Sequence, residues 1–274
     1  MVKQIPIYIS CRDTVSDLCQ LVAWLEGAGH ERIVLVDNAS TWSPLLDYLH
    51  ESPHRVVHLA DNIGPRAFWD AGIFEIDRIP DEPYVVTDPD VLPTEDCPTD
   101  LVDHLLEGLD RYPIIDKAGV GLKIDDLPRH YKHRELVLEW ESQFWQAGLG
   151  PGFFRAQIDT TFAVYRPSIV AWSLQPAARS DIPYLARHLP WYSDLSSPTE
   201  EELYYRERAR SGKGGSNWTQ TDLDSELRRA IWTNRLNPWL VTRIGWRAYL
   251  SARYRSTKAW TEAKKLKRRL GGHN

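Results

Sequence analysis

The sequence predicts an α/β fold with a mostly parallel central sheet flanked by helices, followed by a C-terminal helical extension. Over the first 125 residues, short runs rich in β-branched residues alternate with helical stretches, and acidic or amide side chains follow several of these runs. From residue 225 onward helix-favouring residues dominate, which predicts the extension. In open sheets of this kind, ligands bind outside the carboxyl ends of the strands.

The elements follow from local patterns. The predicted strands are 5–10, 32–36, 55–59, 84–87, 118–123 and 160–165, and the predicted helices are 15–27, 65–76 and 100–111. Aromatic residues mixed with glycines over 140–154 favour a loop-borne recognition surface. Pro, Ser and charged residues near 179–215 predict a mobile loop.

The composition is that of a globular protein. Hydrophobic residues make up 42% and charged residues 26% of the 274 residues, which is enough to bury a core. The sequence contains neither a secretory apolar segment nor an apolar run of about 18 residues, so we expect a cytoplasmic protein. Its three cysteines are odd in number and lack metal-binding spacing, which predicts free thiols.

Charge divides the chain into an acidic body and a basic tail. Residues 243–269 contain ten Lys and Arg against the single acid Glu262, so 23 of the 33 basic and 37 of the 38 acidic residues lie elsewhere. We predict one domain over 1–242 and a basic helix over 243–274. This helix is compatible with packing on the acidic body, with peripheral contact at the inner membrane face, or, least favoured, with nucleic acid.

The predicted strand 84–87 runs directly into Asp88-Pro89-Asp90. Proline biases Asp88 toward extended backbone, so the two carboxylates can project to one side. Closely spaced carboxylates form an oxygen site for Mg²⁺ or Mn²⁺, metals that also bind substrate phosphates. A solvated acidic turn has the same sequence, so the motif alone does not decide between the two readings.

Two further motifs end earlier strands. Residues 36–41 read Val-Asp-Asn-Ala-Ser-Thr, and residues 61–66 read Asp-Asn-Ile-Gly-Pro-Arg. With the Asp-Pro-Asp turn, these segments resemble the family 2-like glycosyltransferases of the GT-A (Rossmann-like) type, over roughly residues 5–125. The resemblance implies that 1–125 is the nucleotide-sugar-binding half and 126–242 the acceptor-binding half.

The resemblance also implies roles for individual residues. Asp37 hydrogen-bonds the nucleobase, with Asn38 in the same nucleotide site, and the backbone from Ser10 to Arg12 helps to hold the nucleoside. Asn62 and Gly64 line the nucleotide pocket, while Arg66 faces the diphosphate or the sugar. Asp70 stands where the family often has Asn, so a sugar contact from that helix is in doubt.

For the metal, the resemblance implies that Asp90 is the direct ligand and that Asp88 contacts the ribose or reaches the metal through water. Many enzymes of this type take a third metal ligand or a diphosphate contact from a later His, and His188 is the candidate. Neutral imidazole can join carboxylates around Mn²⁺. A structural or exposed role for His188 stays open. Trp140, Trp145 and Trp191 are candidates for stacking on acceptor sugars or for core packing.

An inverting transfer needs a general base for the acceptor hydroxyl. Asp159, which precedes the last predicted strand, is the first candidate and Asp194 the alternative, whereas Glu139 and Glu141 resemble the polar face of a helix. The sequence leaves inversion or retention open.

The predicted function is metal-dependent transfer of a sugar from a nucleoside diphosphate donor, with a UDP-sugar favoured, to a hydroxyl acceptor such as a glycan, lipid-linked sugar or small molecule. Two alternatives stay open: a sugar-phosphate nucleotidyltransferase, and a catalytically silent scaffold that binds nucleotide or glycan. The first alternative normally has a Gly-rich phosphate loop after strand one, and residues 10–14 contain no glycine.

Overall fold

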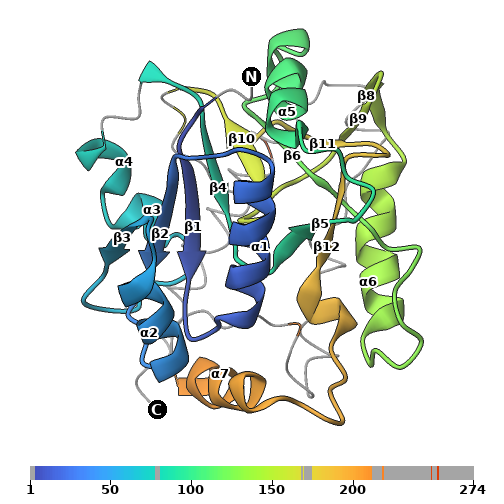
Figure 1. The fold of residues 1–274 in the computed structure, drawn as a ribbon. Coiled ribbons are helices and arrows are strands. Elements are labelled where there is room, and N and C mark those ends of the chain that lie inside the picture. Colours follow the sequence, from blue (N-terminus) through green and yellow to red (C-terminus); the bar gives the residue numbers. More distant parts are fainter. Residues whose placement is uncertain are drawn as a thin grey trace, which may run out of the picture.

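A computed structural model describes residues 4–77, 81–167, 169, 175–211, 218, 248 and 252. The first part of the chain alternates strands and helices as expected (Figure 1). Its elements are β1 (Ile7–Cys11), α1 (Ser16–Gly27), β2 (Ile33–Asp37), α2 (Ser43–Glu51), β3 (Arg55–His58), α3 (Ala67–Asp70), α4 (Ile73–Ile76), β4 (Tyr84–Thr87) and β5 (Val91–Pro93). The predicted basic helix over 243–274 lies outside the described residues, apart from the isolated positions 248 and 252.

The second part adds short strands among helices. It contains α5 (Leu101–Arg111), β6 (Lys117–Gly119), β7 (Gly121–Leu122), α6 (Arg134–Glu141), η2 (Ser142–Trp145), β8 (Gly148–Gly150), β9 (Phe153–Arg155), β10 (Ala163–Tyr165), β11 (Ala177–Ser180), β12 (Leu185–His188), η3 (Leu189–Tyr192) and α7 (Glu200–Ser211). None of the described helices is long and apolar enough to cross a membrane.

The central sheet has nine strands in the order β3-β2-β1-β4-β10-β6-β11-β9-β8, and a second sheet has the order β5-β12-β7. In the central sheet β10 and β9 run against the other strands, which share one direction. The prediction of an α/β fold with a mostly parallel sheet flanked by helices is therefore confirmed. Consecutive side chains alternate between the two faces of a strand, so each face has its own core.

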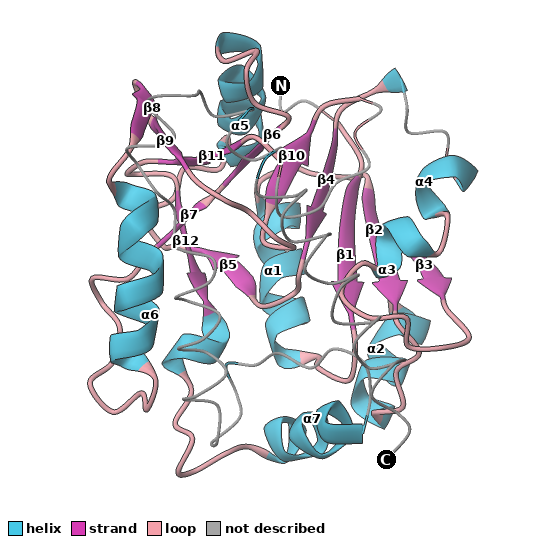
Figure 2. Cartoon of the chain, turned by 180° about the vertical axis from the view of Figure 1, so that it is seen from behind, coloured by secondary structure: helices cyan, strands magenta, loops and turns pink. Residues whose placement is uncertain are grey.

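One core joins Ile7, Ile9 and Leu35 to the apolar faces of α1, α2 and α5. The opposite core joins Tyr8, Val34 and Val36 to α3 and α4, which carry Phe68 and Trp69. Figure 2, seen from behind, shows α3 and α4 on this second face. The carboxyl ends of β1 to β4 therefore stay free of core helices and are available for a site.

Several predicted elements differ from the structure. The predicted helix 65–76 is broken into α3 and α4 at Gly72, whose φ of 71° is the left-handed region that glycine tolerates. The predicted strand 118–123 is divided between two sheets, as β6 and β7. The predicted strand 160–165 is confirmed only over Ala163–Tyr165. Helix α2 was not predicted.

Two regions predicted to be irregular contain regular elements. The aromatic segment 140–154 forms the end of α6, a 3₁₀ turn and the β8–β9 hairpin, with Phe144 and Phe153 each 2% exposed in the core. The predicted loop near 179–215 contains β12, η3 and α7. The loop prediction is wrong for β12 because this segment pairs through its backbone with β5 and β7.

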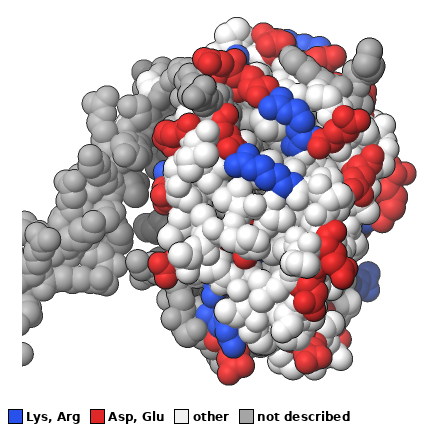
Figure 3. All heavy atoms as spheres, turned by 60° about the vertical axis from the view of Figure 1, so that its left-hand side comes forward, with Lys and Arg blue, Asp and Glu red and all other residues white. Residues whose placement is uncertain are grey.

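Helix α7 crosses the carboxyl ends of the first strands, below the arrowheads of β1 to β3 in Figure 1. None of its residues from Glu200 to Arg208 is buried, and Leu203 is 53% exposed. It is therefore held to the body without a buried apolar face. On the face of the molecule drawn in Figure 3, acidic side chains are spread widely while basic ones gather in a few places.

Candidate functional site

A cavity of about 790 Å³ opens at the carboxyl ends of β1 and β4. Its wall is built by the segment after β1, the Asp-Pro-Asp turn, residues 157–161, the η3 turn and α7, with α6 contributing aromatic side chains. The predicted site residues in this wall are Ser10, Arg12, Asn38, Gly64, Asp88, Asp90, Asp159 and His188. The sheet therefore gathers residues from both halves of the chain into one site.

The two carboxylates of the Asp-Pro-Asp turn have different surroundings. Asp88 Oδ2 accepts a hydrogen bond from Thr160 Oγ1 at 2.5 Å, and the Asp88 amide donates to the Thr160 carbonyl at 3.0 Å. Asp90 Oδ1 is buried and has no hydrogen-bond partner among the described residues. Asp88 is thus tied to the segment before β10, whereas Asp90 keeps an unused oxygen at the cavity.

Burial perturbs the protonation of both acids. Burial, with Asp90 and Asp159 nearby, raises the pKa of Asp88 well above its usual value despite the Thr160 hydrogen bond. Burial is also the largest cause that raises the pKa of Asp90 to about 7, and Asp159 adds to it. Perturbed carboxyl groups gathered in a cavity are typical of functional sites. A cation bound here would offset the negative charge that these groups otherwise avoid.

His188 faces Asp90 across the cavity wall. Its Nε2 atom lies 3.6 Å from Asp90 Oδ2, and its Nδ1 atom is buried without a partner among the residues described. Burial lowers the pKa of His188 to about 4, so the imidazole is neutral at pH 7. The neutral form is the one that binds metal ions.

The three residues predicted to bind metal share the cavity but are not assembled as a ligand set. The described part of the chain holds no group of three or more His, Cys, Asp and Glu side chains that could bind a metal ion. One physical reason is the hydrogen bond that holds Asp88 against Thr160. Mg²⁺ sites commonly use one or two carboxylates and complete their coordination with water and substrate phosphates. The buried, unpartnered oxygen of Asp90 fits such a site.

The two candidates for general base lie in different places. Asp159 is exposed in the cavity wall, and its Oδ1 accepts a hydrogen bond from the Thr160 amide at 2.9 Å. Asp194 is on the surface and is absent from the residues that line the cavity. Its Oδ1 caps Ser196 through the amide and the hydroxyl, which lowers its pKa. The geometry therefore favours Asp159.

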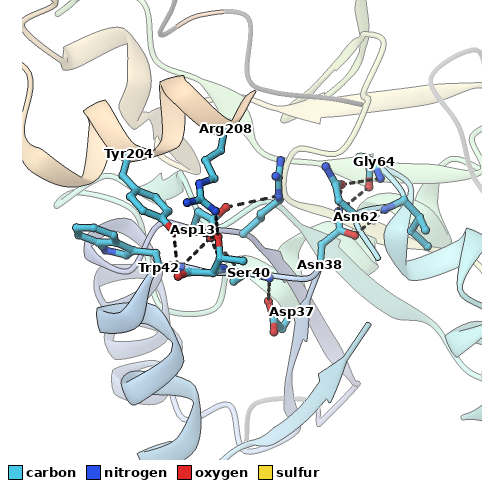
Figure 4. Close-up of polar contacts among 12 residues, drawn as sticks. Asp13, Asp37, Asn38, Ser40, Trp42, Asn62, Gly64, Tyr204 and Arg208 are labelled. Carbon is cyan, nitrogen blue, oxygen red and sulfur yellow. Dashed lines mark hydrogen bonds and ion pairs between the residues drawn. The ribbon is translucent and has the colours of Figure 1, made fainter. Parts of the chain in front are cut away.

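The residues predicted to hold the nucleotide form a network among themselves (Figure 4). Asn38 Nδ2 donates to Asn62 Oδ1 at 3.0 Å and to the Gly64 carbonyl at 3.1 Å, and Asn38 Oδ1 accepts from the Ile63 amide. Asp37 is 3% exposed and is missing from the cavity wall. Its two oxygens contact the Ser40 amide and His58 Nδ1, at 2.9 and 3.0 Å.

These contacts give the two strand-end motifs a structural role. They join the segments after β2 and β3, and each Asp37 oxygen has a hydrogen-bond partner within the chain. Arg66, also outside the cavity wall, forms an ion pair with Asp70 at 3.1 Å. Ser10 and Arg12 line the cavity as predicted, and Arg12 Nε is buried without a hydrogen-bond partner in the described structure.

Asp13 was not predicted as a site residue, yet it organises the segment after β1. It is fully buried with φ at 53°, and its Oδ1 accepts from the amides of Thr41 and Trp42 at 2.6 and 3.0 Å. This carboxylate joins the loops that follow β1 and β2 (Figure 4). The available sequence signal was an Asp just after a predicted strand, because Asp is enriched among non-glycine residues with positive φ.

Helix α7 docks on the same two loops. Glu201 Oε1 accepts from the amides of Val15 and Ser16 at the N-terminus of α1, the latter at 3.2 Å. Tyr204 packs on Trp42 with ring centroids 4.5 Å apart and donates to the Thr41 carbonyl, and Arg208 donates to Thr41 Oγ1. Tyr204 and Arg208 reach down from α7 in Figure 4. The helix therefore forms part of the cavity wall beside the loops that follow β1 and β2.

Sequence reasoning also missed a buried ion pair in the cavity wall. Arg179 Nη1 and Glu141 Oε2 are 2.5 Å apart, and their side chains are only 7% and 2% exposed. The expectation that Glu141 lies on the polar face of a helix is therefore wrong, because the end of α6 turns into the cavity wall. No local pattern in the sequence relates these residues, which lie 38 positions apart.

Asp17 is a further missed acid of the wall. It stands in the first turn of α1 and faces Asp90, Glu201 and Glu202. Burial, and then these three acids, raise the pKa of Asp17 to about 7. The wall near α1 and α7 is thus strongly acidic.

No protein-family model matches the chain, and no curated protein matches its sequence. Three solved structures with a similar fold illustrate the structural matches. HddC from Yersinia pseudotuberculosis, complexed with GMP-PN, is 16% identical with a TM-score of 0.34, over 46% of this chain and 62% of that one. Glucosyl-3-phosphoglycerate synthase from Mycobacterium tuberculosis, in complex with phosphoglyceric acid, is 13% identical with a TM-score of 0.37, over 60% and 57%.

The third is 4-diphosphocytidyl-2C-methyl-D-erythritol synthase from Anaerococcus prevotii, at 10% identity and a TM-score of 0.37, over 84% of this chain and 97% of that one. The chain thus spans less than two thirds of the first two structures. With TM-scores below 0.5, these similarities do not assign the chain to the family of any of these enzymes.

Proposed function

We propose that the protein is a nucleotide-sugar-dependent transferase of the nucleotide-diphospho-sugar transferase superfamily, and specifically a glycosyltransferase. The observation that carries this proposal is the buried, unpartnered oxygen of Asp90. It lies at the carboxyl end of a parallel strand, opposite a neutral His188, in a cavity that the segment after β1 also lines. Carboxylates that need a cation suit a substrate that carries a diphosphate.

Asp90, with His188 or Asp88 beside it, would hold Mg²⁺ or Mn²⁺. The metal, when bound, neutralises the charge that develops on the leaving diphosphate. In the transfer, the bond between the anomeric carbon and the diphosphate oxygen breaks, and its electron pair stays on the diphosphate. The acceptor oxygen forms the new bond to the same carbon, and its proton passes to the carboxylate of Asp159.

The donor's nucleoside would lie against Ser10, Arg12 and Gly64, which line the same cavity as Asp90. Asn38 would support this pocket by holding Gly64, through its hydrogen bond to the Gly64 carbonyl. The same bond places the loop after β3 against the end of β2. A UDP-sugar is the favoured donor.

The first test is thermal stabilisation by a panel of UDP-, GDP- and TDP-sugars with Mn²⁺, together with slow release of nucleoside diphosphate. A ligand at 100 times its Kd stabilises the folded state by about 2.7 kcal/mol. We expect one donor class to stabilise the protein and Asp90→Asn to abolish the metal-dependent part. Asp194→Asn, which removes a surface carboxylate outside the cavity, is the matched control and should leave the shift unchanged.

The outcomes separate the open functions. Release of nucleoside diphosphate supports the glycosyltransferase. Release of pyrophosphate from a nucleoside triphosphate and a sugar phosphate would instead establish the nucleotidyltransferase. Binding without turnover when acceptors are supplied would identify a silent scaffold. If no nucleotide stabilises the protein and Asp90→Asn changes nothing, the proposal is wrong.

A further inference from the structure

One wall of the cavity carries buried polar atoms that the protein does not use. Gln157 and Thr161 line the cavity and are only 7% and 8% exposed. Gln157 Nε2 and Thr161 Oγ1 have no hydrogen-bond partner among the described residues. Because buried polar groups in folded proteins are almost always paired, two unpaired atoms in the wall of one cavity indicate a ligand with hydrogen-bonding groups.

The charge of this wall argues against an anionic ligand. Its one buried cation, within the described structure, is Arg179, whose Nη1 is paired with Glu141 at 2.5 Å. Arg179 Nε donates to the Gln157 carbonyl at 3.1 Å, and the guanidinium carbon lies 4.6 Å from the Phe144 ring centroid. Asp159 adds a second carboxylate to the same wall. A ligand carrying a phosphate or carboxylate would therefore meet more negative than positive charge.

Aromatic side chains complete the wall. Trp140 is partly exposed and lines the cavity, with its ring 5.4 Å from Phe144 in an edge-to-face arrangement. Trp218, also partly exposed, lies 5.7 Å from Trp191. Aromatic rings that combine an apolar face with nearby polar atoms suit ligands that have one apolar face and several hydroxyls.

We infer that this wall is the acceptor subsite and that it takes an uncharged saccharide. Its hydroxyls pair with Gln157 and Thr161, and the C–H face of a sugar ring lies on Trp140. Asp159, on the same wall, then faces an acceptor hydroxyl. That the bound saccharide is an acceptor rests on the proposed glycosyl transfer. The saccharide site itself can be tested without nucleotide.

The experiment is saturation-transfer NMR on the full-length protein in EDTA. The probes are the methyl glycosides of glucose and galactose, with methyl glucuronide and methyl galacturonide as their charged counterparts and 3-phosphoglycerate as a second type of anion. We expect at least one neutral glycoside to bind, and its carboxylated counterpart to bind at least tenfold more weakly.

Four variants locate the binding. Gln157→Leu and Thr161→Val each remove one hydrogen-bonding group at similar volume, and each should weaken binding about three- to tenfold. Thr161→Ser keeps the hydroxyl and should stay within about twofold of the wild type, the scatter expected of a single conservative change. Gln146→Leu changes an exposed glutamine outside the cavity wall and should have no effect. Melting temperatures confirm that each variant is folded.

The inference is overturned if no neutral glycoside binds, if the anions bind as tightly as their neutral counterparts, or if Gln157→Leu and Thr161→Val bind like the wild type. The nucleotide panel is run in parallel on the same variants. If the wild type binds a neutral glycoside but no nucleotide, the proposed function is wrong and the saccharide site is still supported.

Discussion

The two walls of the cavity differ in how their polar side chains are used. In the loops after β1, β2 and β3, Asp13 and Asp37, which lie outside the cavity wall, accept hydrogen bonds from backbone amides, and Asn38 donates to Asn62 Oδ1. On the wall formed by α6 and residues 157–161, Gln157 and Thr161 keep atoms without partners among the residues described. Hydrogen bonds within the chain thus hold the loops of the first wall together, although Arg12 Nε in that wall also has no partner among the described residues.

The recognisable motifs differ in the same way. Asp37-Asn38 is hydrogen-bonded within the loops, whereas Asp90 of the Asp-Pro-Asp turn keeps an unpartnered oxygen. The second wall combines the end of α6, residues 157–161 and Arg179, which only the fold brings together. Substitutions in and near the two walls test this difference.

The largest effect is expected for Glu141→Ala. The substitution leaves the Arg179 guanidinium buried without its carboxylate, and breaking one side of a buried ion pair costs about 3–5 kcal/mol. Urea denaturation at pH 7 measures the loss. The double variant Glu141→Leu with Arg179→Met removes both charges and should lose less than Glu141→Ala alone. A single variant as stable as the wild type would show that the second wall does not depend on this pair.

The next largest effect concerns Asp13, which joins the loops after β1 and β2. Asp13→Ala removes the acceptor of the Thr41 and Trp42 amides, and we expect a loss of about 2–3 kcal/mol because hydrogen bonds to a charged group are lost and the buried amides stay unpaired. Asp13→Asn keeps an acceptor and tolerates the positive φ. It should therefore lose about half as much stability as Asp13→Ala. Equal losses in both variants would mean that the charge, rather than the acceptor, holds the loops together.

A smaller effect depends on pH. The pKa of Asp17 is raised to about 7 in the folded protein, first by burial and then by Asp90, Glu201 and Glu202, against about 3.9 when unfolded. The folded state therefore binds more protons between pH 4 and pH 7. The stabilisation is complete below pH 4 and is lost as pH rises through 7.

Asp17→Asn removes this contribution. From pH 5 to pH 7 in EDTA, the wild type should lose about 1–2 kcal/mol more than the variant, since each pKa unit corresponds to about 1.4 kcal/mol. Chemical denaturation at a series of pH values provides the measurement. Parallel curves for the two proteins would contradict the perturbed pKa.

The smallest effect is expected for Asp194→Ala. This exposed carboxylate accepts local hydrogen bonds from Ser196, so the denaturation midpoint and the rate of sugar transfer should both stay at wild-type values. Asp159→Asn, tested in the same transfer assay, should lower the rate by at least a hundredfold if it is the base. A rate that drops for Asp194→Ala instead would assign the role of base to Asp194, which follows η3.

The strongly periodic first half could be predicted from the sequence. Strand 84–87 is correct at both ends, and the position of Asp90 just after it led to the cavity, whereas Asp37 at the end of β2 lies outside the cavity wall. The prediction of one helix over 65–76 is wrong because Gly72, in the left-handed conformation, interrupts an otherwise helical pattern. Strands β11 and β12 carry no clear alternation, since their residues are almost all buried. The Glu141–Arg179 pair depends on tertiary contact, which a single sequence does not reveal.

Helix α7 has a consequence for any measured affinity. Glu201 already occupies the amides of Val15 and Ser16, where the helix dipole of α1 attracts negative charge. An anionic group that reaches these amides competes with a carboxylate of the same chain, so its apparent Kd is its intrinsic Kd divided by the fraction of molecules in which α7 has moved aside. Substitutions in α7 can therefore change ligand affinity without touching the ligand.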